Sequence, residues 1–274
     1  MDFVYIEQQS GVAAQQCFAD KSRDNAVKFK PNWGWASLPA LLMVWVIVAS
    51  HYPSYVLPQP WDVWREAIRW FSDGSIWGQL QASLLEEFTG FLTAVLLALI
   101  LGVSAGLSDR VREFLTPLNS LFMAIPPIAW APLMLLIFGL GFVSIVVVIV
   151  IAALFPMCLA IQEGIRGIRG GEVRAARTLG ARPFQLLLHV YLPSSLPFIT
   201  AALRIGFSQA WRALVAAEML GASQGIGWMV AMGGQTGNSS QVLLGICLIG
   251  LIAWLMENLV FRRIEQRYQR WRAR

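Results

Sequence analysis

The sequence contains few of the residues from which catalytic and metal-binding sites are usually built. It has 3 cysteines and 2 histidines, and Cys158 and Cys247 fall inside apolar runs, where a thiol behaves as a small hydrophobic group. His51 and His189 lie far apart in the sequence, and no paired-carboxylate, Ser-His-Asp or Cys-His pattern accompanies them. We therefore predict no catalytic residue, no metal ligand and no redox role for the cysteines.

Lysine is equally scarce. Lys21, Lys28 and Lys30 all precede the first apolar run. A phosphate-binding loop is a glycine-rich segment that ends in Lys-Ser or Lys-Thr, and the sequence has no such segment. We therefore expect this polypeptide neither to bind nor to hydrolyse ATP itself, and we do not predict an enzyme.

Charged residues are absent from two long stretches. No Asp, Glu, Lys or Arg occurs between Glu87 and Asp109 or between Glu113 and Glu163, and 57% of the chain is hydrophobic against 14% charged. The mean hydropathy is +0.58. A chain of this composition would expose large apolar patches in water, whereas about 20 apolar residues are enough for one helix to cross a bilayer. The sequence therefore indicates a membrane protein.

The apolar runs predict an all-α transmembrane fold of about six membrane-spanning helices, at 36–52, 84–107, 115–138, 143–162, 195–219 and 242–261. No small-residue cleavage site follows the first run, so we expect it to remain as an anchor. The predicted organisation is a cytosolic N-terminal tail (1–35), a transmembrane domain (36–261) with a cytosolic loop at 163–193, and a basic C-terminal tail (262–274).

Basic residues indicate the orientation of these helices. Cytosolic loops of membrane proteins are enriched in Lys and Arg. With the N-terminus inside, most of the 21 basic residues fall on the cytosolic side, and only Arg65 and Arg69 fall in an outer loop. We therefore predict that both termini are cytosolic, and that the pI of 9.4 reflects topology and not nucleic-acid binding.

Small residues recur every four positions along the second predicted span, at Gly90, Ala94, Ala98, Gly102 and Gly106. This spacing places them on one ridge of a helix, where they allow a neighbouring helix to approach closely. We predict a packing face there.

Three prolines, Pro126, Pro127 and Pro132, interrupt the third predicted span. A proline inside a helix removes a backbone hydrogen bond and kinks the chain. The pattern is compatible with a kink that lines a cavity and with one that serves only packing.

The loop at 163–193 contains a short amphipathic segment. From Glu172 to Gly180, helical spacing places Val173, Ala176 and Leu179 on one side and arginines on another. Gly180 can adopt the left-handed conformation that ends a helix, and a following helix is predicted to begin at Pro183. An isolated helix of this length is unstable in water, so we expect it to dock on something.

A spaced signature runs through this loop, made of Ala175, Ala176, Gly180, Val190, Leu192 and Pro193. It resembles the EAA loop of the membrane subunits of ATP-binding-cassette (ABC) importers, Glu-Ala-Ala, three residues, Gly, nine residues, Ile, one residue, Leu-Pro, although Arg174 stands where that pattern has Glu. The segments "LRIGFSQAWRALVAAEML" and "IPPIAWAPL" extend the resemblance, over residues 36–265, to the permeases of the nitrate, sulfonate, taurine and bicarbonate group.

The resemblance implies a permease that works as a homodimer in the plasma membrane and imports a small anion by alternating access. Two separate ATPase subunits would use ATP and Mg²⁺, no cofactor would bind this chain, and an extracytoplasmic binding protein would deliver the solute. The loop helix would be the coupling helix that docks on the ATPase, through Val173, Arg174, Ala175, Ala176, Arg177, Leu179 and Gly180.

In the fifth predicted span, five residues lie within about 40° of one line along the helix, namely Arg204, Ser208, Trp211, Val215 and Glu218, and all but Val215 are polar or aromatic. Because ionisable residues inside a span usually face an interior cavity, we predict that this face lines the translocation path. Arg212 is offset from the line by about 80°. Alternatively, Arg204 and Arg212 pair with acids on neighbouring helices and lock the bundle.

The uncharged, glycine-rich segment 221–241 is too short in its apolar centre to span a membrane. We interpret it as a re-entrant or surface helix on the outer side, which by resemblance would face the binding protein; a simple external loop is the alternative.

Three other functions fit the same residues. The chain could be a secondary transporter or channel with a regulatory cytosolic helix, although no internal repeat is evident. It could be a scaffold that only anchors an ATPase. The amphipathic segment could also lie on anionic lipid.

Overall fold

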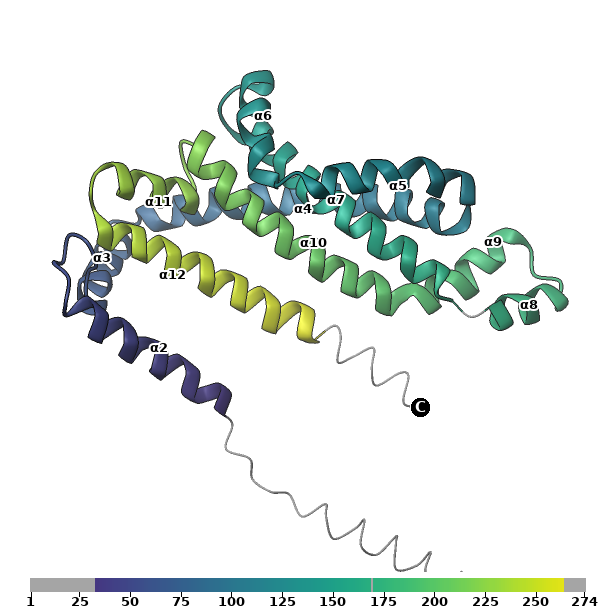
Figure 1. Cartoon of the computed structure of the whole chain (residues 1–274), viewed down its shortest axis with the longest axis horizontal. Helices are drawn as coiled ribbons and strands as arrows, with labels where there is room; N and C mark the ends of the chain where they lie inside the picture. Colours follow the sequence, from purple (N-terminus) through teal and green to yellow (C-terminus); the bar gives the residue numbers. More distant parts are fainter. Residues whose placement is uncertain (1–32, 169, 264–274) are drawn as a thin grey trace, which may run out of the picture. The chain divides into compact units, whose positions relative to one another are not determined.

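The computed structural model describes residues 33–168 and 170–263 of the chain, and the elements in these ranges are all helices (Figure 1). The chain divides into two units, 1–48 and 49–274. In the first unit, helix α2 (Trp33–Ala49) is almost uniformly apolar, and most of its large side chains are exposed. The predicted tails, 1–35 and 262–274, lie largely outside the described residues.

The second unit contains the remaining helices: α3 (Pro60–Ser72), α4 (Ser75–Leu107), α5 (Asp109–Ala124), η1 (Pro127–Trp130), α6 (Ala131–Phe138), α7 (Phe142–Arg166), α8 (Gly170–Thr178), α9 (Pro183–Leu186), η2 (Leu187–Tyr191), α10 (Leu192–Gly221), α11 (Ile226–Gln235), α12 (Ser239–Met256) and η3 (Glu257–Phe261). Among the described residues, 4 helical segments are long and apolar enough to cross a membrane, and a bent pair would make a fifth. A shorter apolar helix covers Ser37–Ala49. The all-α transmembrane fold is confirmed.

The third predicted span, 115–138, is corrected by the structure. It is not one helix but the two pieces Asp109–Ala124 and Pro127–Phe138, which meet at 91°. Ile125 and Pro126 are extended, with ψ of 121° and 134°. A residue that precedes proline avoids the helical region, and here two prolines follow Ile125 in succession. The break is therefore built into the sequence, and its angle exceeds a simple kink.

Small residues let the three long helices α4, α7 and α10 pack closely. A Cβ added at Gly90 would lie 2.8 Å from Cβ of Ile149 on α7, and one at Gly102 would lie 2.8 Å from Cβ of Ile161. On α10, a Cβ at Gly206 would lie 2.2 Å from the sulfur of Met157. The predicted packing face on α4 is therefore confirmed, and α7 is the helix that it contacts.

The second unit has two dissimilar ends. Helices α8 and α9 lie at one end, which we call the α8 end, and α3 and α11 lie at the other, the α11 end (Figure 1). At the α8 end, Arg166 at the close of α7 pairs with Asp109 at the start of α5, at 3.3 Å.

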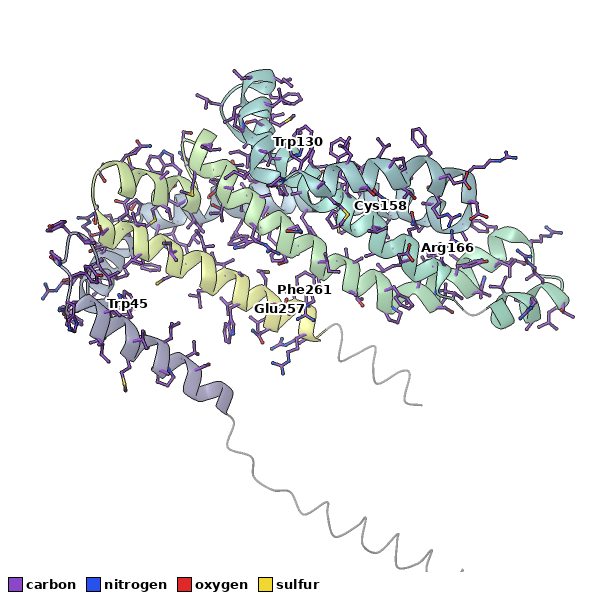
Figure 2. All side chains as sticks on the ribbon, in the orientation of Figure 1. Trp45, Trp130, Cys158, Arg166, Glu257 and Phe261 are labelled. Carbon is purple, nitrogen blue, oxygen red and sulfur yellow. The ribbon has the colours of Figure 1, made fainter. Side chains whose placement is uncertain are left out.

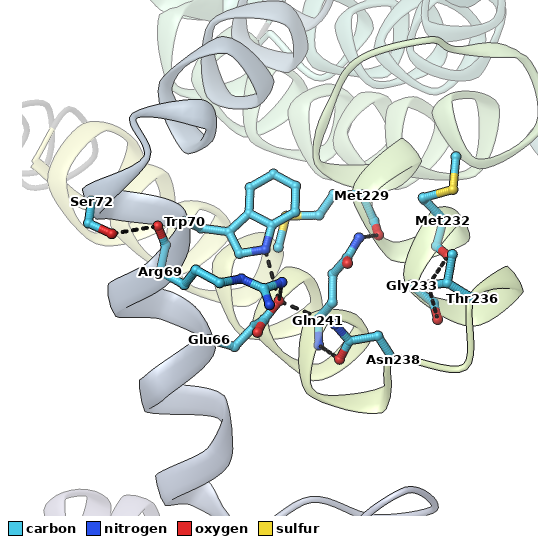
Figure 3. A network of polar contacts seen from close by, with 10 residues as sticks. All are labelled: Glu66, Arg69, Trp70, Ser72, Met229, Met232, Gly233, Thr236, Asn238 and Gln241. Carbon is cyan, nitrogen blue, oxygen red and sulfur yellow. Dashed lines mark hydrogen bonds and ion pairs between the residues drawn. The ribbon is translucent and has the colours of Figure 1, made fainter.

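A polar network joins α3 to the turn between α11 and α12 (Figure 3). Oε1 of Glu66 accepts hydrogen bonds from Trp70 at 3.0 Å and from Asn238 at 3.3 Å. Asn238 caps α12 by accepting from the backbone N–H of Gln241, whose side chain donates to the carbonyl of Met229. These contacts hold the segment between the first and second predicted spans against α11 and α12.

Candidate functional site

A cavity of about 570 Å³ lies along one side of α10. Its polar lining residues are Thr200, Arg204, Ser208, Gln209, Arg212 and Glu257. Most of them come from a single helix face, where Thr200, Arg204, Ser208 and Arg212 recur every four residues. Their side chains form a polar stripe on a helix that is long and apolar enough to span a membrane.

Glu257 enters the cavity from the end of α12. Its carboxylate pairs with the guanidinium of Arg204, and the two side chains are 40% and 51% exposed. Figure 2 shows Glu257 and Phe261 on the segment that runs beside α10. The alternative in which Arg204 pairs with an acid on a neighbouring helix is therefore what the structure contains, although Arg204 still lines the cavity.

Arg212 is held differently. Its Nε donates to the backbone carbonyl of Ser208 and its Nη2 donates to the hydroxyl of Ser208, both at 2.9 Å. Among residues 33–168 and 170–263, no carboxylate forms an ion pair with Arg212. The guanidinium is thus oriented by its own helix and keeps its positive charge uncompensated on the cavity side.

The stripe is costly to place against lipid. Arg204, Ser208 and Arg212 are exposed on this chain, and charged side chains within a span almost always face a bundle interior or a water-filled cavity. The arrangement therefore suits a polar path that a second surface shields from lipid.

The other residues predicted for the path lie elsewhere. Trp211 is only 4% exposed and belongs to the main hydrophobic core with Leu214 and Met157. Val215 is half-buried, and Glu218 is 1% exposed. The structure thus brings Arg204 and Ser208 together with Arg212, and it separates them from Trp211, Val215 and Glu218, none of which lines this cavity.

Glu218 lies in a buried junction at the α11 end. Its Oε2 accepts a hydrogen bond from the backbone N–H of Gly227 at 2.6 Å. The two preceding N–H groups, of Ile226 and Gly225, donate to Ser83 at 2.8 Å and to Gln79 at 2.6 Å on α4. The first N–H groups of a helix have no partner within the helix, and here side chains of α4 and α10 supply the acceptors. We call this set the α11 junction.

Two glycines of the α11 junction have no space for a side chain. Gly225 has a φ of +124°, and a Cβ there would lie 2.6 Å from the Glu218 carboxyl carbon. A Cβ at Gly227 would lie 2.6 Å from the carbonyl oxygen of Val215. These close approaches explain glycines at both positions, and the helix Ile226–Gln235 agrees with the short helix predicted in segment 221–241.

At the opposite end, α8 and α9 form a small helical hairpin that the sequence predicted. Gly180 has a φ of +82°, which confirms it as the left-handed residue after the helix. The backbone N–H groups of Gly180 and Ala181 donate to the carbonyls of Arg177 and Ala176 at 2.9 and 3.1 Å. The hairpin therefore ends α8 sharply and turns the chain toward α10.

The predicted docking residues divide between two sides of α8. Leu179, just after the helix, is 89% exposed, and Arg174, Ala175 and Arg177 are also exposed. Ala176 is half-buried, whereas Val173 is only 9% exposed and packs within this chain. Leu179 and the arginines are thus presented outward, and Val173 is not.

Residues 94–272 match the model of the family described as binding-protein-dependent transport system inner membrane components. This range includes the cavity on α10 and the α8–α9 hairpin.

The chain belongs to that family.

Similar proteins carry related names. The permease is 36% identical to the taurine transport system permease protein of Escherichia coli strain K12, over 86% of this chain and 88% of that one. It is 31% identical to a putative aliphatic sulfonates transport permease protein of Bacillus subtilis, over 92% and 94% of the two chains. It is 32% identical to a nitrate import permease protein of Synechococcus elongatus, over 81% and 85%.

Solved structures support the fold. A chain of the MetNI methionine ABC transporter in inward-facing conformations matches with a TM-score of 0.58 at 20% identity, covering 73% of this permease and 98% of that chain. A chain of an amino acid ABC transporter crystallised with histidines matches with a TM-score of 0.57 at 18% identity, covering 74% and 96%.

Sequence reasoning missed several residues of the permease cavity, namely Thr200, Gln209, Arg212, Glu257 and Phe261. Arg212 is not among the predicted path residues because it is offset from a line parallel to the helix axis. Side chains at i, i+4 and i+8 follow a ridge inclined to that axis, and the four-residue spacing of Arg204, Ser208 and Arg212 was the available signal. Glu257 had a weaker signal, as an acid that follows an uncharged run.

Proposed function

We propose that this permease forms the translocation path of an ABC importer for a small anion. The observation that carries the proposal is the polar cavity on α10, where two arginines and neutral hydrogen-bonding groups share one face of a spanning helix. Taurine, aliphatic sulfonates and nitrate, which appear in the names of the relatives, all carry a compact oxyanion. Guanidinium groups bind such oxygens well.

A second copy of the chain completes the path in this proposal. The polar stripe is exposed along α10 and would be unfavourable against lipid. A homodimer in which two such stripes face each other would enclose a polar space between them.

The outward side of α8 is the docking surface for the ATPase, which uses ATP and Mg²⁺ on its own subunit. Leu179 would enter an apolar groove, and Arg174 and Arg177 would pair with acids at its rim, in the manner of a helix bound in a groove. Val173 keeps α8 attached to this chain and makes no contact with the ATPase.

The hairpin can transmit motion to the cavity because the chain is helical from Phe184 through Gly221. ATP binding would draw the two hairpins together, and α10 would move as a rigid element and open the cavity to alternate sides. The driving force enters at an interface that has two stable arrangements.

The basic residues support an orientation with the α8 end in the cytosol and both termini inside. Six arginines belong to this end: Arg110 and Arg112 at the start of α5, Arg166 at the end of α7, Arg174 and Arg177 in α8, and Arg182 just before α9. Arg65 and Arg69 belong to α3 at the other end. The α11 end would then face the extracytoplasmic binding protein. The permease would reside in the plasma membrane, which is the inner membrane of a two-membrane cell.

Reconstitution tests the function. The permease, its ATPase and its binding protein are placed in vesicles, and uptake of labelled taurine, ethanesulfonate and nitrate is measured with and without internal ATP. We expect uptake of at least one of these solutes that requires both ATP and the ATPase. Uptake by the permease alone would instead support a secondary transporter or channel, and a complex that hydrolyses ATP without uptake of any of them would support a scaffold.

Cross-linking tests the docking surface. A cysteine at Leu179 should cross-link to the ATPase in native membranes, whereas one at Val173 should not, because that side chain is buried.

Gly180→Asp should leave insertion intact and reduce ATPase retention, since only glycine adopts this φ readily. Retention of the ATPase at normal stoichiometry would contradict the assignment.

A further inference from the structure

The cavity on α10 contains more positive charge than its ion pair uses. Arg204 and Glu257 neutralise each other across α10 and η3. Arg212 lines the same cavity and has no carboxylate partner among the described residues. The charged groups that line the cavity thus leave one positive charge per copy of the chain.

The position of Arg212 is fixed by two contacts. The carbonyl and hydroxyl oxygens of Ser208 take its Nε and Nη2 donors, each at 2.9 Å. A guanidinium has five N–H donors in a rigid plane, so these two bonds set the plane and leave other donors for a ligand. Arg212 is therefore positioned in advance to donate to an oxyanion.

Resting on the function proposed above, we propose that Arg212 contacts the transported anion and that Glu257 makes the cavity select a singly charged anion over a doubly charged one. A singly charged anion balances the remaining charge beside α10. In the homodimer each copy would hold its own anion beside its own α10. A doubly charged anion at one such site would leave one negative charge that this copy does not balance, which is costly inside the membrane. Thr200 and Gln209 add neutral hydrogen-bonding groups, which carry no preference for charge.

A cysteine reporter can measure binding in this cavity without measuring transport. Ala201 lines the cavity and is exposed, so Ala201→Cys introduces a thiol beside the site. The background carries Cys17→Ser and Cys247→Ser, because Cys247 is exposed and Cys158 is buried. The complete complex with its ATPase is placed in nanodiscs, and an uncharged maleimide modifies the thiol in the presence of methanesulfonate or sulfate. These probes share a tetrahedral shape and differ by one charge.

We measure the concentration of each probe that halves the modification rate. The parent should be protected by methanesulfonate. Glu257→Gln should shift the ratio of the two half-protecting concentrations toward sulfate by about fivefold or more, because removal of one nearby negative charge favours the second charge of sulfate. Arg212→Gln should raise both concentrations by about tenfold, and Arg212→Lys should recover part of the protection. Asp73→Asn, at an exposed position outside the cavity, is the matched control and should leave the ratio unchanged.

Any one of four results would overturn the proposal. Glu257→Gln could leave the ratio unchanged, or it could weaken protection by both probes equally, which is the result of a purely structural role. Arg212→Gln could leave protection intact, which would place the anion elsewhere. Protection by neither probe in the parent would also refute it; in that case ATP-dependent uptake in vesicles would still stand as the separate test of the proposed function. The modification rate without probe, compared between variants, shows whether each variant keeps the cavity.

Discussion

The two polar regions of α10 differ in burial and in charge. The stripe from Thr200 to Arg212 is largely exposed and contains two arginines. The α11 junction is buried and contains Glu218, which is 1% exposed. Two further acids of α4, Glu86 and Glu87, interact with Glu218 and are 6% and 2% exposed. In the junction, side-chain acceptors of α4 and α10 are used to cap a short helix. A polar residue within a span therefore does not by itself identify a path, since the same helix uses such residues for a cavity and for a structural joint.

A bulky substitution should affect the stripe most strongly. Ala201→Trp places a large side chain in the cavity, and we expect uptake by the reconstituted complex to fall by at least about tenfold while assembly with the ATPase continues, because the bore of a pore limits what passes through it. Leu96→Trp, at an exposed position of α4, is the control. Normal uptake by Ala201→Trp would show that the stripe does not line the translocation path. The two polar regions of α10 would then not differ in function.

Two glycines of α11 test how tightly the α11 junction is packed. Gly227→Ala forces a Cβ to within 2.6 Å of the Val215 carbonyl oxygen, whereas a Cβ at Gly234 meets nothing within 4 Å. Overpacking costs about 1–3 kcal/mol, so we expect a lower thermal midpoint for Gly227→Ala and no loss for Gly234→Ala. The measurement is thermal unfolding of the purified complex.

Equal thermal midpoints for the two alanine variants would show that the α11 junction accommodates an added methyl group without loss of stability. The junction would then not be tightly packed, contrary to the close approaches described above.

The smallest change should come from Glu218→Gln. A glutamine keeps the shape and an oxygen acceptor for the N–H of Gly227, so we expect initial uptake rates within about twofold of the parent. Glu218→Leu leaves that buried N–H without its acceptor, at a cost of about 1–3 kcal/mol, and should lower the thermal midpoint. A large loss of uptake in Glu218→Gln at an unchanged thermal midpoint would indicate that Glu218 takes part in transport and is not only structural.

The sequence was sufficient for features that depend on nearby residues. Among the described residues, runs without charge predicted the four helices that are long and apolar enough to span a membrane. The four-residue repeat of small residues predicted the α4 packing face, and Gly180 and Pro183 predicted the ends of the hairpin helices. Each signal lies within one element, where spacing along the chain determines geometry.

Features that depend on distant segments were not predictable in the same way. The pairing of Arg204 with Glu257 depends on how α12 packs beside α10, and the burial of Glu218 depends on where α11 returns to α4. The predicted line of path residues treated α10 as a straight rod with one polar face. Neighbouring helices bury this face at Trp211 and Glu218 and leave it exposed at Arg204 and Ser208. The predicted path residues are therefore divided between the two regions.

The most direct test of the central claim asks from which side of the membrane the cavity is reached. Ala201→Cys, in the background described above, is exposed in vesicles of the full complex to a membrane-impermeant thiol reagent added on one side. The reaction is run without nucleotide and after ATP hydrolysis in the presence of vanadate, which traps ADP on the ATPase. The account predicts that the accessible side changes between the two states. Modification from the same side at the same rate in both states would contradict it.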